Sequence, residues 1–136
     1  MPKNLFFKED YTYKESVCHI ISDTQQGIII AKESITRNYQ ELENYIREHQ
    51  FFFHTFDPVS VPNEPLVAKL MALAAQKASV GPMAAVAGVI ADLAVVDMQK
   101  TGCKVAVVED GGEISAVSDR PIDVALAAGN EPLSKR

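Results

Sequence analysis

The first half of the chain combines short β-forming runs with one long periodic stretch. Residues 11–15 alternate as Tyr-Thr-Tyr-Lys-Glu and residues 17–22 are rich in β-branched side chains, which predicts two strands or one bent strand. Over residues 28–49 apolar side chains recur every three or four positions and charged ones occupy the other side, which predicts an amphipathic helix. The aromatic run 51–56 is interpreted either as an edge strand or as a loop that fills the core.

Proline and glycine divide the second half into further elements. A helix is predicted over residues 65–78, where Asn63 or Glu64 would cap it and Pro65 would occupy its first turn. A second helix is predicted over residues 82–100, and because its side chains are apolar or small nearly all round it is expected to be buried. In the helix predicted over residues 65–78, the stripe predicted to face the core consists of Leu66, Leu70, Leu73, Ala74 and Lys77.

The end of the chain predicts mainly strands. Two β-prone runs, 104–109 and 113–118, flank the turn Asp110-Gly111-Gly112 and predict a hairpin. Residues 122–127 predict one more strand. Strands, then helices, then strands favour an α+β fold in which the helices pack on one face of an antiparallel sheet. The length of 136 residues suits a single domain over residues 1–136.

Charge and composition narrow the classes of partner. The net charge is −5, so the clustered basic residues that nucleic-acid binding requires are missing. Cys18 and Cys103 lie far apart in the sequence and are expected to be buried thiols. The longest apolar run, 80–91, is too short to cross a bilayer, and the first residues lack a signal-peptide core. We therefore expect a soluble, cytoplasmic protein with neither a membrane nor a nucleic acid as partner.

The start of the 82–100 helix is the first candidate site. Gly81, Pro82, Met83 and Ala84 lead into a helix whose first N–H groups carry partial positive charge, and small residues there let a phosphate approach closely. The other interpretation is a plain turn between two helices.

The acidic hairpin turn is the second candidate. Glu109, Asp110 and Glu113 flank Gly111 and Gly112, so they are candidates to chelate a divalent cation or to hold a ribose hydroxyl. The alternative is a solvated hairpin tip. The three histidines of the chain (His19, His49 and His54) show no spacing typical of a zinc site.

The motifs around both candidate sites carry a family resemblance. The runs Val80-Gly81-Pro82-Met83-Ala84-Ala85-Val86-Ala87-Gly88 and Val107-Val108-Glu109-Asp110-Gly111-Gly112-Glu113-Ile114 resemble a prokaryotic ApbE-like family, uncharacterised protein family 0280. That family is related to the FAD:protein FMN transferases. Tyr13-Lys14-Glu15-Ser16, residues 37–46 and Asp119-Arg120-Pro121 are similar to it as well, so the resemblance covers nearly the whole chain.

The resemblance implies a fold and a ligand. ApbE-like proteins consist of tunnelling-fold units, and this chain would form one such unit, the N-terminal half of the usual family length. The implied ligand is FAD or FMN, with Mg²⁺ as the implied metal. The residues implied to meet the ligand or the metal are Gly81, Pro82, Met83, Ala84, Glu109, Asp110, Gly111, Gly112 and Glu113.

Departures from the transferase pattern shape the functional expectation. The Lys of the transferases' Gly-Gly-x-Ala-Lys-Gly helix start corresponds to Ala87, and their Asn before the Gly-Gly-Asp turn corresponds to Asp110. Their metal-binding Asp and Thr lie in a C-terminal half, beyond Arg136. We therefore expect binding of a flavin nucleotide or a related phosphate-containing ligand rather than transferase activity of this chain alone. The alternative is a non-catalytic interaction or structural domain that keeps the fold without the ligand.

The predicted strand edges imply self-association. Open edges and a nearly all-apolar helix both need burial, so we expect a homo-oligomer, most simply a two-fold dimer. The ligand site would then lie near the subunit boundary.

Overall fold

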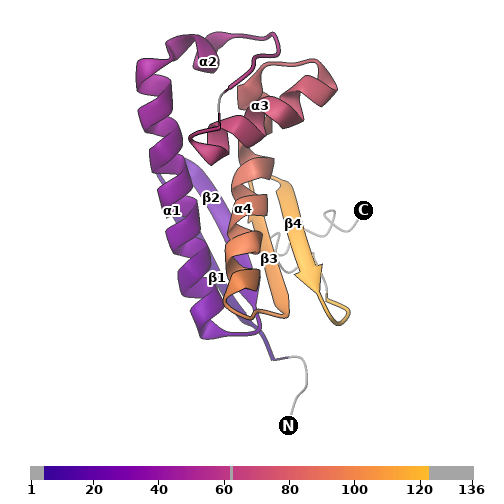
Figure 1. The fold of residues 1–136 in the computed structure, drawn as a ribbon. Helices are drawn as coiled ribbons and strands as arrows, with labels where there is room; N and C mark the ends of the chain where they lie inside the picture. Colours follow the sequence, from indigo (N-terminus) through magenta and orange to yellow (C-terminus); the bar gives the residue numbers. More distant parts are fainter. Residues whose placement is uncertain (1–4, 62, 123–136) are drawn as a thin grey trace.

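The computed structural model describes residues 5–61 and 63–122. The predicted strand 122–127 falls, apart from Ile122, outside these residues. Figure 1 shows the elements in chain order. They are β1 (Phe7–Tyr13), β2 (Ser16–Ser22), α1 (Gln25–Glu48), α2 (Gln50–His54), α3 (Leu66–Ala78), the 3-10 helix η1 (Pro82–Ala85), α4 (Val86–Lys100), β3 (Val105–Asp110) and β4 (Glu113–Ser118).

The strands form one antiparallel sheet in the order β1-β2-β3-β4, and α1 and α4 lie side by side over one of its faces (Figure 1). The prediction of an α+β fold with helices on one face is confirmed. Cys18, Ile20, Ala106 and Val108 point to the helices and join the main core. The alternate residues of β2 and β3 point to the opposite face, where Ile21, Val105 and Val107 form a smaller cluster with Phe6 and Ile122.

Helix α1 begins at Gln25, three residues before the predicted start at residue 28. The Thr24 side chain accepts a hydrogen bond from the Gly27 backbone N–H at 2.9 Å and so satisfies one of the unpaired donors of the first turn. Gly27 is required by space, because a Cβ there would lie 2.1 Å from the Ser22 Oγ and 2.5 Å from the Cys103 Sγ. Both predicted thiols, Cys18 and Cys103, are buried and free.

Helix α4 forms the centre of the core. Its buried residues are Val89, Ile90, Ala91, Ala94, Val95 and Met98, in contact with α1 and the sheet. The helical stretch Pro82–Lys100 has the length and apolar composition of a membrane span. Its buried side packs against α1 and the sheet, which is consistent with a soluble protein, while 39% of the stretch is buried in all; a cytoplasmic location stays a prediction.

The aromatic run 51–56 is neither of the two elements predicted for it. Residues 50–54 form the short helix α2, in which Phe52 is buried while Phe51 and Phe53 are exposed. One buried position in five is consistent with one turn of helix touching the core at one point. The strand and the core-filling loop are therefore both wrong.

The core-facing side of α3 also differs from the prediction. Val67, Ala68, Met71, Ala72 and Ala75 are buried, whereas Leu66 and Leu73 are exposed. The small side chains permit close packing against η1 and α4, and this packing decides which side of the helix turns inward. Pro65 itself occupies the N-cap position, so the predicted Asn63 or Glu64 cap is wrong as well.

Candidate functional site at the hairpin end of the sheet

Both hairpin turns lie at one end of the sheet, which we call the hairpin end. Strand β2 starts there and β3 finishes there, because Cys18 pairs with Asp110 and Ser22 with Ala106. The turn of Lys14 and Glu15 joins β1 to β2, and the turn of Gly111 and Gly112 joins β3 to β4. Helix α1 passes over this end through Tyr39, and α4 reaches it near its N-terminus at Gly88.

The β1–β2 hairpin is fastened to α1. The Tyr13 hydroxyl donates to Glu43 Oε1 at 2.9 Å, and Lys14 Nζ lies 3.0 Å from Glu43 Oε2. The Tyr13 ring stacks on the Tyr39 ring with centroids 5.3 Å apart. Lys14 adopts a positive φ of 54° that glycine would tolerate better, so its contact with Glu43 offsets a conformational cost.

Asp110 is buried beneath α1 and its carboxylate is held inside the protein. The Tyr39 hydroxyl donates to Asp110 Oδ2 at 2.7 Å, and the Cys18 thiol provides a second hydrogen bond. Burial raises the pKa of Asp110, and the two donors act against that rise. Burial, together with the nearby Asp110 and Glu109 carboxylates, raises the pKa of Cys18 to about 12.

Burial is also the main cause that raises the pKa of Tyr39, and Asp110 adds to it. The thiol and the phenol therefore stay protonated near neutral pH and serve as donors. The Asp110 carboxylate is already bound by both, so we assign it a structural role instead of a ligand contact.

Glu109 points to the opposite face of the sheet. Its Oε2 accepts a hydrogen bond from the Gly112 backbone N–H and so holds the turn. Its Oε1 lies 3.6 Å from His19 Nε2, and His19 Nδ1 lies 2.6 Å from Asp10 Oδ1. The pairing register places Asp10, His19 and Glu109 in one row across three strands, a row that the sequence analysis missed.

The three predicted carboxylates therefore do not converge. Paired residues Asp110 and Glu113 share the helix side of the sheet, and Glu109 lies on the other side. Within residues 5–61 and 63–122, no group of three or more His, Cys, Asp or Glu side chains is placed to hold a metal ion. The trio does not fit Mg²⁺, and of the three only Glu113 is exposed.

Three glycines leave bare backbone at the hairpin end. Gly111 and Gly112 have φ of 59° and 96°, and an added Cβ would meet nothing within 4 Å at either position. At Gly88 an added Cβ would meet only Glu113 Oε1, at the ordinary contact distance of 3.7 Å. A glycine inside a helix costs about 1 kcal/mol relative to alanine. Packing among the described residues does not require Gly88, so its presence calls for another reason.

The predicted Gly-Pro segment lies on the same helical stretch, before Gly88. Gly81 is buried, and its backbone packs closely against residue Thr55. A Cβ at this position would lie 2.1 Å from the Thr55 carbonyl oxygen, so this close packing explains the glycine. Pro82 is buried, Met83 is half-buried and Ala84 is exposed. The Ala84 N–H donates to the Gly81 carbonyl at 3.2 Å. Ala84 is therefore the one exposed residue among these four.

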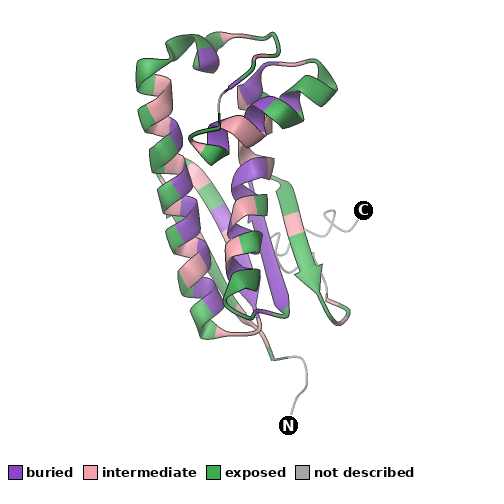
Figure 2. Cartoon of the chain, in the orientation of Figure 1, coloured by how far each residue is buried: buried purple, intermediate pink, exposed green. Residues whose placement is uncertain are grey.

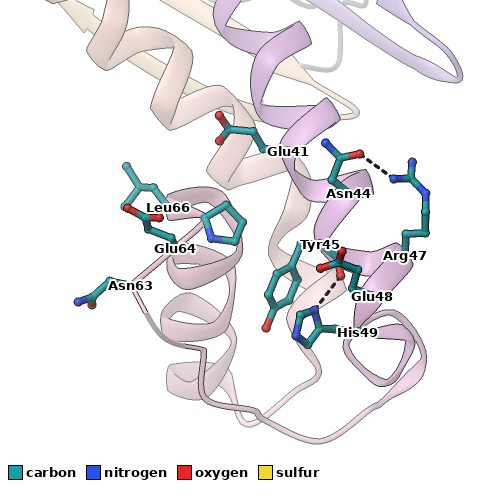
Figure 3. A pocket seen from close by; sticks show the side chains of 10 residues that line it. Glu41, Asn44, Tyr45, Arg47, Glu48, His49, Asn63, Glu64 and Leu66 are labelled. Atoms are coloured by element: carbon teal, nitrogen blue, oxygen red, sulfur yellow. Dashed lines mark hydrogen bonds between the residues drawn. The ribbon is translucent and has the colours of Figure 1, made fainter.

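A cavity of about 1060 Å³ lies elsewhere, between the C-terminal part of α1 and the start of α3 (Figure 3). Arg47 is held there by Asn44 at 2.8 Å, and the rings of Tyr45 and His49 stack 4.1 Å apart. Three glutamates outnumber the single arginine, which disfavours a phosphate. The sequence analysis did not find this cavity, because it assigned these charged residues to the side of the helix opposite the apolar stripe. Its lining residues are Glu41, Asn44, Tyr45, Arg47, Glu48, His49, Asn63, Glu64, Pro65 and Leu66.

Comparison with known proteins places these features in a family. Residues 12–136 match the family described as AbpE bacteria. The chain is 42% identical over 127 residues to a UPF0280 protein of Methanospirillum hungatei, covering 93% of this chain and 52% of that protein. A UPF0280 protein of Methanosphaerula palustris is 40% identical over 124 residues, covering 91% of this chain and 52% of that protein. The chain thus spans about half the length of the curated relatives it matches.

Proposed function

We propose, from the premise that this chain belongs to the AbpE bacteria family, that it binds a phosphate-containing nucleotide of the flavin type. The ligand would lie at the hairpin end, over the Gly111–Gly112 turn and the N-terminal part of α4. The proposal concerns binding alone. The tunnelling fold implied by the resemblance to the FAD:protein FMN transferases stays part of this proposal.

One observation carries the proposal: the turn glycines and Gly88 belong to segments far apart in the sequence, yet all three leave backbone bare at the same end of the sheet. Backbone without Cβ atoms lets a flat or pyrophosphate-bearing ligand lie directly against the main chain. Gly88 strengthens the argument, because a helix-interior glycine without a packing reason is unfavourable for stability.

Local charges favour a sugar contact over a metal contact. Glu113 is exposed beside Gly88 and is free to accept hydrogen bonds from ribose hydroxyls. Glu109 and Asp110 are engaged with Gly112 and with Tyr39, respectively. We therefore assign the sugar contact to Glu113 and the backbone contacts to the glycines.

Calorimetric titration with FAD, FMN, ADP and riboflavin tests the proposal. We expect FAD and FMN to bind, and riboflavin, which lacks the phosphate, to bind at least about tenfold more weakly. Failure of folded protein to bind any of the four at millimolar concentration would refute the proposed function.

A variant pair tests the location. Gly88→Leu places a side chain across the bare backbone and is expected to weaken FAD binding by about tenfold or more. Gln99→Leu makes the same kind of change at an exposed position near the other end of α4 and is expected to leave binding unchanged. Equal affinities in the two variants would show that the ligand lies elsewhere.

A further inference from the structure

The two edge strands of the sheet differ in how they discourage pairing with another strand. Strand β1 carries Lys8, Glu9 and Asp10 in succession, and Lys32 of α1 forms an ion pair with Glu9. Strand β4 reads Glu-Ile-Ser-Ala-Val-Ser, with its single charge at the first position and no proline. Charges and proline are common means of protecting an edge, so by their own residues β1 is protected and β4 is not.

The side chains of β4 are also exposed on both faces of the strand. Figure 2 shows it exposed along nearly its whole length, whereas the neighbouring β3 is buried throughout. Ile114 on one face and Val117 on the other are each 41% exposed. Val96 on the adjacent α4 is 44% exposed. An unprotected edge flanked by exposed apolar side chains is typical of a surface that pairs with another strand.

We propose that β4 pairs antiparallel with β4 of a second copy of this chain, so that the two sheets join as one. This inference is independent of the proposed ligand. Pairing β4 with β1 of another copy would leave one unpaired β4 and one unpaired β1 and so build an open array, whereas β4 with β4 leaves only the charged β1 edges and closes a two-fold dimer.

The charge pattern favours a register centred on Ser115 over one centred on Ala116. Centring the pair on Ser115 sets Glu113 opposite the partner subunit's Val117 and Ile114 opposite the partner subunit's Ala116. Centring it on Ala116 would set Glu113 opposite the partner subunit's Asp119, and like charges directly opposite are destabilising. In the Ser115 register no like charges meet along β4, and residues of the same face stay together, so the helices of both copies lie on the same side of the joined sheet.

Sedimentation equilibrium of the full chain at micromolar concentrations tests the proposal. We expect a species of twice the chain mass of 14.9 kDa. A monomer at all of these concentrations would overturn the inference.

A charge-swap pair tests the register and the identity of the partner. The double variant Ile114→Lys with Ala116→Lys places lysines opposite each other in the proposed register, and Ile114→Glu with Ala116→Glu does the same with glutamates. Both positions are exposed, so folding should persist, as circular dichroism would verify. For each variant alone we expect the dissociation constant of the dimer to rise by about tenfold or more relative to the unmodified chain. An equimolar mixture of the two variants should form the dimer again, because lysines then lie opposite glutamates.

The control Thr12→Lys adds a charge to β1, at an exposed position of the other edge, and is expected to leave the dimer unchanged. A dimer that survives both double variants, or variants that stay monomeric when mixed, would show that β4 does not pair with itself.

Discussion

The two hairpins of this small sheet end side by side but are completed in different ways. The β1–β2 hairpin makes its contacts within the chain: Tyr13 and Lys14 bind Glu43, and Tyr13 stacks on Tyr39. The β3–β4 hairpin has a turn of two glycines next to open space, and the side chains of β4 are exposed on both faces. The difference indicates that the first hairpin serves stability and that the second is available to a ligand and a partner.

Removal of the Tyr39 side chain should give the largest effect on stability. Tyr39→Ala loses the stack on Tyr13 and the hydrogen bond to Asp110, and we expect the free energy of unfolding to fall by about 2–4 kcal/mol. Urea denaturation measures it. The control Ile114→Ala, on the exposed β4, should cost less than about 1 kcal/mol. Equal losses would contradict the contrast between the hairpins.

Filling the buried glycine should have the next largest effect. Gly81→Ala places a Cβ 2.1 Å from the Thr55 carbonyl oxygen, a backbone atom that cannot rotate away. We expect a loss of about 1–3 kcal/mol in the free energy of unfolding, measured by thermal or urea denaturation. An unchanged stability would mean that packing does not require Gly81 and would return this residue to the candidate ligand contacts.

High pH should weaken the layer beneath α1. The pKa of Cys18 is raised from 9.0 to about 12, so between these values the unfolded chain releases a proton that the folded chain retains. The contribution of Cys18 to the free energy of unfolding is therefore complete below about pH 9. Above pH 9 the free energy of unfolding falls by about 1.4 kcal/mol per pH unit. The pKa of Tyr39 is also raised, so this residue adds to the fall above the ordinary pKa of tyrosine. Cys18→Ala should show a shallower decline in urea denaturation above pH 9. Parallel declines in the two proteins would contradict this assignment.

The smallest expected change in stability has the opposite sign. Gly88→Ala has room for its Cβ and removes the helix penalty of glycine, so we expect unfolding to become harder by about 0.5–1 kcal/mol. We expect the same variant to bind FAD more weakly in a calorimetric titration. A variant that loses stability would show that Gly88 is needed for packing, and one that gains stability without losing affinity would separate Gly88 from the ligand.

The sequence predicted most elements because their signals are local. Pro82 starts a helix and the two glycines form the turn of the β3–β4 hairpin, as predicted, whereas the Thr24 cap that starts α1 at Gln25 was not predicted. The first strand begins at Phe7, four residues before the alternation at Tyr11, because the charges that protect an edge strand mask its pattern. The inward side of α3 depended on packing against η1 and α4, which the position of its leucines does not encode.

The candidate site was predictable in part. The glycine turn and its acidic neighbours were found from the sequence, and strand alternation explains why Glu109 and Asp110 separate once β3 extends to Asp110. The contact of Tyr39 with Asp110 joins residues 71 positions apart, and no local pattern announces such a pair. The bare backbone at Gly88 likewise depended on knowing what surrounds that helix.

Hydrogen–deuterium exchange tests the contrast between the two hairpins most directly. Amides of residues 7–22 should keep the same protection at low and high protein concentration and with or without FAD. Amides of residues 114–118 should gain protection as the concentration rises, and those of residues 88 and 111–112 should gain it when FAD is added. An increase confined to one of these sets would support one proposal and refute the other. The contrast would be wrong if no amide changed its protection, or if residues 7–22 responded as strongly as the β3–β4 hairpin. In either case the β3–β4 hairpin would be no more available to a ligand or a partner than the β1–β2 hairpin.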